Sequence, residues 1–141
     1  MAGYSGTPLA TKLGIKPGDL LCLKGAPAGY LQNLGQLPEK VRVVLRSSRP
    51  ATANVIHFFS KDCAELERSL PIFLRQMKQD GMIWVSWPKK ASGVPSTITE
   101  DVIRKVALPL GLVDTKVCAV DEIWSGLKLV IRRENRKLPV A

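Results

Sequence analysis

The chain has 141 residues, of which 45% are hydrophobic and 23% charged, a composition typical of one globular domain rather than of a disordered or fibrous protein. No apolar run approaches the roughly 20 residues of a membrane-spanning helix, and residues 1–6 lack a signal-peptide pattern, so we expect a cytoplasmic protein with no membrane partner. The net charge of +9 is unusual, and it favours nucleic acid, anionic metabolites or acidic proteins as partners.

The first half of the chain predicts a short helix and three strands. Residues 7–13 carry a proline in the first turn and a lysine in the last, and Gly14 follows as a left-handed stop. A first strand at 19–24 leads into the small-residue loop 25–29. Apolar runs at 41–46 and 54–59 predict the second and third strands, and the third is apolar enough to be central.

A long helix and a buried strand are predicted next. Ser60 is expected to cap this helix, whose apolar residues recur at threes and fours as far as Met77, with a kink or break at Pro71. We expect the helix to end in a glycine turn at Gly81. The strand at 82–87 is apolar at all but one position, which is typical of a strand covered on both faces.

The chain is expected to finish with a helix and a hairpin. A capping-box pattern at 97–100 predicts the start of a helix that stops at Gly111. Strand-like runs at 115–122 and 127–132 are joined by the short connection 123–126, which predicts an antiparallel hairpin. The fold class is therefore α/β, with a Rossmann-like, mostly parallel six-stranded sheet flanked by helices. One domain is expected over 1–133, followed by a basic tail over 134–141.

The sequence contains no evident catalytic or metal-binding set. Cys22, Cys63 and Cys118 lie far apart without a Cys-x-x-Cys pair, so buried thiols are expected. His57 is the single histidine, and inside a predicted strand its expected role is that of a packed side chain rather than a base. One histidine supports neither a zinc site nor a Ser/His/acid set, so we predict no catalytic residue, metal or cofactor.

Two resemblances bear on function. The order of elements from residue 54 to the final hairpin resembles the second half of the class I S-adenosylmethionine-dependent methyltransferase fold, and the first half resembles a shortened version with two strands where that family has three. Most of the chain also resembles a bacterial family of uncharacterised small proteins, through the strings at 2–9, 87–93, 116–122 and 124–127. That second resemblance implies no activity.

The methyltransferase resemblance implies a cofactor site with an acidic residue at the end of each of the first two strands. Lys24 and Arg46 occupy those places here. Two cations in place of two carboxylates remove the acceptors for the ribose hydroxyls and repel the cationic sulfonium. A divergent or degenerate methyltransferase is therefore the alternative hypothesis, and a non-enzymatic binding module is preferred.

The preferred candidate site gathers cations, glycines and a serine near the carboxyl ends of predicted parallel strands. Its residues are Lys24, Gly25, Gly29, Arg46, Lys89, Lys90 and Ser92. Open α/β sheets bind ligands at this edge, so we expect a basic rim for a phosphate-bearing metabolite, a nucleotide or RNA, with Trp87 or Tyr30 available for stacking. The alternative is that these lysines are simply solvated.

A second candidate lies around the predicted hairpin turn, at Asp121, Glu122 and Trp124. An acidic pair beside a tryptophan is suited to a partner-binding or dimer surface, which would make the chain a homo-oligomer through its hairpin edge. The alternative, which we favour, is that the two acids blunt an edge strand and hydrogen-bond the turn.

Overall fold

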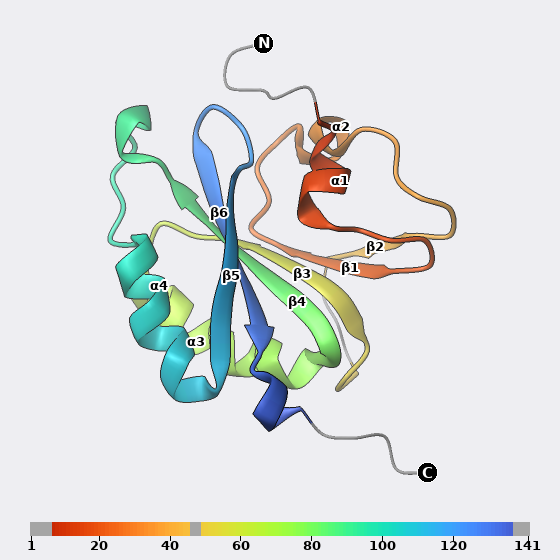
Figure 1. Cartoon of the computed structure of the whole chain (residues 1–141). Coiled ribbons are helices and arrows are strands. Elements are labelled where there is room, and N and C mark those ends of the chain that lie inside the picture. Colours follow the sequence, from red (N-terminus) through yellow and green to blue (C-terminus); the bar gives the residue numbers. More distant parts are fainter. Residues whose placement is uncertain (1–6, 46–48, 137–141) are drawn as a thin grey trace.

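The computed structural model describes residues 7–45 and 49–136. In this part of the chain, six strands form one sheet in the order β2-β1-β3-β4-β6-β5 (Figure 1). The strands are β1 (Leu20–Lys24), β2 (Arg42–Val44), β3 (Ala53–Phe59), β4 (Met77–Pro88), β5 (Leu112–Ala119) and β6 (Trp124–Ile131). β1 to β4 run parallel, while β6 is antiparallel to both β4 and β5. The predicted α/β class, the six strands and the shortened methyltransferase-like order are confirmed.

Helices cover both faces of the sheet. α1 (Leu9–Leu13) and α2 (Tyr30–Leu34) lie on one side, and α3 (Cys63–Gln76) and α4 (Glu100–Ala107) lie on the other (Figure 1). Short 3-10 turns complete the structure: η1 (Lys90–Ser92), η2 (Leu108–Leu110) and η3 (Arg133–Asn135). The opening helix ends at Gly14, whose φ of 78° is left-handed as expected.

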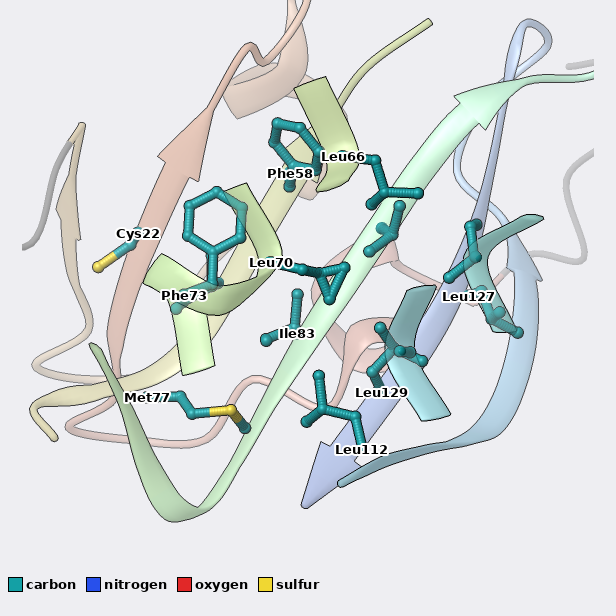
Figure 2. Close-up of a cluster of buried hydrophobic side chains, with 14 of the residues drawn as sticks. Cys22, Phe58, Leu66, Leu70, Phe73, Met77, Ile83, Leu112, Leu127 and Leu129 are labelled. Carbon is teal, nitrogen blue, oxygen red and sulfur yellow. The ribbon is translucent and has the colours of Figure 1, made fainter. Parts of the chain in front are cut away.

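Alternate residues of the central strands build two separate cores. Phe58 and Ile83 point to the α3 side, where Figure 2 shows them packed with Leu66 and Leu70 of α3 and with leucines of β5 and β6. The other face of the same strands buries Val55, Phe59 and Trp84 against α1 and α2. Because β3 and β4 are covered on both faces, the continuous apolar runs in the sequence have a direct explanation.

α3 differs from its prediction at its start and in its middle. Its N-cap is Asp62, whose carboxylate accepts the N–H of Ala64, and Ser60 is not the cap. The helix runs unbroken through Pro71, so of the two expected outcomes, a kink or a break, the break is wrong. Leu66, Leu70 and Phe73 are buried on both sides of the proline, and this burial offsets the roughly 3 kcal/mol that an interior proline costs.

The expected glycine turn at Gly81 is also wrong, because β4 begins directly after α3. Ala53 pairs with Met77 but Val55 pairs with Met82, so β4 carries extra residues in an irregular stretch. A Cβ on Gly81 would lie 3.0 Å from the carbonyl oxygens of Ala53 and Asn54. Glycine is needed there for close approach of two strands and not for a turn.

The hairpin is confirmed, but its turn lies three residues earlier than expected. β5 ends at Ala119 and β6 begins at Trp124, so Gly126 sits inside β6. A Cβ on Gly126 would be 3.2 Å from Ser86 Oγ, which explains the glycine by packing. The preceding helix α4 is capped by Thr99, which accepts the N–H of Val102, and not by the first residue of the 97–100 pattern.

Candidate functional site

Lysines follow three neighbouring parallel strands at the carboxyl edge of the sheet. β1 ends at Lys24, β3 is followed by Ser60 and Lys61, and β4 is followed by Lys89 and Lys90. Since β3 lies between β1 and β4, Lys24 and Lys89 belong to strands two spacings apart, roughly 10 Å, and Lys89 lies four residues beyond Val85, which the register sets level with Lys24 through Phe58. Lys61 lies between them in strand order and was missed by the sequence analysis, although it meets the same strand-end criterion.

These four lysines, Lys24, Lys61, Lys89 and Lys90, are named here the basic edge. Lys24, Lys61 and Lys90 are exposed and Lys89 is half-buried. No ion pair is found for any of the four in the part of the chain that the structure describes. The basic edge therefore holds positive charge that is not neutralised by a salt bridge, which makes it attractive to anions. Arg46 of the predicted rim lies outside the described residues.

The remaining predicted rim residues, Ser92, Gly25 and Gly29, fix the course of the backbone. Ser92 donates its hydroxyl to the carbonyl of Lys89 at 2.6 Å and accepts the N–H of Val94, so it fixes the exit loop of β4. Gly25 and Gly29 both have positive φ, of 73° and 83°. A Cβ on Gly25 would come within 2.6 Å of the Phe59 carbonyl oxygen, so this glycine lets the loop pass against β3.

The loop at 25–29 lines neither of two hollows found in the surface of the described residues. One, of about 1260 Å³, is open and lies around the start of β4 between Arg49 and Arg136. The other, of about 110 Å³, lies between β1 and α3, and Lys24 is the one member of the basic edge that lines it. Lys61, Lys89 and Lys90 line neither of these two hollows.

Tyr30 and Trp87, which were expected to be available for stacking, are buried in opposite cores with 3% and 8% of their surface exposed. Neither ring is available to a ligand base. This part of the rim prediction is wrong because the apolar bodies of both side chains complete the packing of the sheet faces.

Residues of the hairpin turn stabilise the turn itself. Asp121 Oδ1 accepts the N–H groups of Ile123 and Trp124 at 2.8 and 2.7 Å. The Trp124 ring packs edge-on against Phe59, with 5.2 Å between ring centroids. Glu122 is exposed. The contacts of Asp121 are those of a turn-forming acid, the use favoured from the sequence.

A buried polar chain that the sequence did not reveal joins α2 to the sheet. His57 Nδ1 lies 2.7 Å from the Tyr30 hydroxyl, and its Nε2 lies 2.7 Å from Ser86 Oγ. Burial lowers the pKa of His57 to about 3 and raises the pKa of Tyr30, which the nearby Cys118 also raises. The ring is therefore neutral near pH 7, with one nitrogen donating and the other accepting.

This chain of hydrogen bonds is sealed from solvent, since His57 and Ser86 have no exposed surface. It resembles a catalytic arrangement in composition, but His57 and Ser86 present no surface to solvent at which a substrate could approach. Its role is to hold α2 against β3 and β4. Within 7–45 and 49–136 there is also no group of three or more His, Cys, Asp or Glu side chains placed to hold a metal ion. No helix over those ranges has the length and apolarity needed to cross a bilayer.

Comparisons with known proteins identify a family and a fold. The family model described as "Protein of unknown function (DUF3052)" matches residues 42–133. No curated protein shows significant sequence similarity. Among solved structures, a SAM-dependent methyltransferase from Aquifex aeolicus is similar at 17% identity and a TM-score of 0.65, over 86% of this chain and 87% of that one.

Two further structures are similar over 87% of this chain, each at 11% identity and a TM-score of 0.59. One is the tRNA methyltransferase TrmK from B. subtilis, with 63% of its chain covered. The other is the fibrillarin pre-rRNA processing protein from Methanococcus jannaschii, with 73% of its chain covered. At these identities the similarity shows a methyltransferase-like fold and nothing finer.

Proposed function

The chain belongs to the family described as "Protein of unknown function (DUF3052)", and we propose that it is a non-enzymatic module that binds the phosphate backbone of RNA. The observation that carries this proposal is the basic edge, where four lysines gather at the place at which open α/β sheets bind ligands. The net charge of +9 supports it, because excess positive charge draws polyanions to the surface.

The shape of the edge favours RNA over a small phosphate-bearing metabolite. Small ligands are bound in concave sites that bury most of their surface, whereas three of the four lysines stand exposed and the loop at 25–29 lines neither hollow. Phosphate backbones bind to such open surfaces through charge alone and release counterions. Two of the similar structures are named for work on tRNA and pre-rRNA, which agrees with this proposal.

Neutralising the basic edge is expected to weaken RNA binding and its salt dependence. In the triple variant Lys24→Gln, Lys61→Gln, Lys89→Gln, three phosphate contacts are lost, so the slope of log K against log salt should fall in magnitude by about 2. The measurement is fluorescence anisotropy with a labelled single-stranded oligouridylate across a series of salt concentrations.

The matched control removes the same charge elsewhere, through Arg68→Gln on α3, Lys78→Gln near the start of β4 and Lys105→Gln on α4, all exposed positions. This control should retain most of the parent's affinity. The proposal fails if the parent does not bind the oligonucleotide at low salt. It fails equally if the control loses as much affinity and slope as the basic-edge variant.

A second candidate function, a divergent methyltransferase, is favoured by the extent of the fold similarity over 86% of the chain. Against it stands Lys24 at the end of β1, where the methyltransferase resemblance implies an acidic residue. The test is thermal unfolding with S-adenosylmethionine. At about 100 times its dissociation constant a ligand adds about 2.7 kcal/mol, which raises the melting temperature of such a domain by roughly 5–10 °C. Failure of excess cofactor to raise it excludes this candidate.

A further inference from the structure

A second group of lysines lies away from the basic edge, on the side of the sheet that carries α1. Lys12 belongs to α1, Lys16 follows it, Lys116 lies in β5 and Lys128 in β6. Lys116 and Lys128 are directly opposite one another in the antiparallel pair. The Lys116 ammonium also reaches to 3.5 Å from the main-chain oxygen of Lys12, which ties β5 to α1. These four residues are named here the lysine cluster.

The lysine cluster stores electrostatic repulsion. Like charges that face one another across antiparallel strands destabilise the pair. The pKa of Lys128 is lowered, first by partial burial and then by the charges of Lys116 and Lys16. The same crowding acts on Cys118, whose pKa is raised by burial but opposed by the charges of Lys12 and Lys116.

No ion pair relieves this repulsion at Lys16, Lys116 or Lys128 within the described ranges. Asp19 is an acid that a hydrogen bond ties to the cluster: its carboxylate accepts the main-chain N–H of Lys16 at 2.9 Å, so a single negative charge lies beside that residue. On the opposite side of the sheet, by contrast, Arg104 is held by three carboxylates at 3.0 Å each. The fold thus brings Lys16, Lys116 and Lys128, for which the described residues supply no ion pair, to one place.

β6 connects the lysine cluster with the basic edge. Trp124 pairs with Pro88 at the carboxyl edge, and Lys128 pairs with Trp84 four residues further along the same strand. An even separation puts Trp124 and Lys128 on one face, about 14 Å apart along the strand, with the buried Gly126 between them. Lys89 adjoins the start of β6, because its N–H donates to the carbonyl of Ile123 at 2.7 Å.

We propose that the lysine cluster is a second phosphate-binding surface, and that a single RNA strand reaches from the basic edge to Lys128, Lys116, Lys16 and Lys12. This inference rests on the proposed function and extends it to a second surface. RNA is the occupant that fits both halves, because one polyanion can neutralise two separated groups of lysines at once, and a compact anion would reach one group only.

The test is the double variant Lys116→Gln, Lys128→Gln, measured with the same labelled oligouridylate. Loss of two phosphate contacts should lower the slope of log K against log salt by about 1.4 in magnitude. The charge-matched control is Lys78→Gln, Lys105→Gln, which should keep the parent's slope. If the double variant binds as its parent does, or if the control loses as much, the lysine cluster is not a binding surface.

Two features keep this result separate from the proposed function. If the parent binds RNA and only the basic-edge triple variant is impaired, the extension of the RNA to the lysine cluster is refuted while the basic edge stands. Thermal unfolding without RNA guards against misfolding, because removal of the facing charges should leave the melting temperature unchanged or raise it. A variant that melts well below the parent contradicts the premise of stored repulsion. The basic-edge triple variant keeps the lysine cluster intact. If inorganic triphosphate competes with RNA at that cluster only, the cluster binds a compact anion, and this result would also overturn the extension of the RNA to the cluster.

Discussion

Replacing His57 with alanine is expected to lower the free energy of unfolding by about 3–5 kcal/mol. The substitution leaves a cavity in a fully buried position between β3 and α2. It also removes the partners of the Tyr30 hydroxyl and Ser86 Oγ, which His57 holds at 2.7 Å each. Buried hydroxyls without partners retain their desolvation cost after the compensating bond has gone. Urea unfolding followed by circular dichroism measures the change.

The matched control is His57→Gln, which keeps a donor and an acceptor but cannot take up a proton. The folded state of the parent holds a His57 pKa of about 3, below the ordinary 6.5, so the unfolded state is protonated first as pH falls. The stability that the neutral His57 contributes is fully present above pH 6.5 and is lost progressively as the pH falls toward 3. Between pH 7 and 5 the free energy of unfolding decreases by about 2 kcal/mol for this reason. Equal pH dependence in parent and His57→Gln would contradict a neutral, buried imidazole.

Continuous apolar runs made the centre of the fold predictable. Residues 54–59 and 82–87 are apolar on both faces of their strands, and the structure buries both faces under helices. Gly14 and Gly111 were correctly interpreted as stops, because each follows a helical pattern that ends with it. In these places local sequence and tertiary packing require the same structure.

Glycines inside strands were predicted wrongly, because a sequence does not distinguish a glycine needed for its backbone angles from one needed for space. Gly81 and Gly126 are both of the second kind, since an added Cβ would press on Ala53 or on Ser86. Polar chains between distant residues were equally hidden. Tyr30 and Ser86 lie 27 and 29 residues from His57, and only the sheet order brings the three together.

The misplaced turn also concealed the lysine cluster. A turn at 123–126 pairs Glu122 with Leu127 and therefore sets Asp121 opposite Lys128, which is an attractive pair. The true register sets Lys116 opposite Lys128, which is a repulsive one. Strand-end lysines such as Lys24 and Lys89 could be foreseen, because their place at the carboxyl edge depends on strand direction alone and not on register.

Replacing Gly25 with alanine is expected to lower the free energy of unfolding by about 2–4 kcal/mol. The φ of 73° is unfavourable for alanine, and the new Cβ would lie 2.6 Å from the Phe59 carbonyl oxygen. That oxygen belongs to the backbone of β3 beside the point where Lys24 pairs with Phe58, so it cannot withdraw without disturbing the pairing of β1 with β3. Urea unfolding of parent and variant measures the loss.

Gly18→Ala is the matched control for this prediction. Gly18 has almost the same φ, 79°, but a Cβ there meets nothing within 4 Å. Gly18→Ala should lower the free energy of unfolding only by the cost of a left-handed backbone at alanine, about 1 kcal/mol. The excess cost of Gly25→Ala therefore isolates the contact with β3. If the two variants lose equal stability, the loop after β1 yields freely. Lys24 would then not be held in a fixed position on the basic edge.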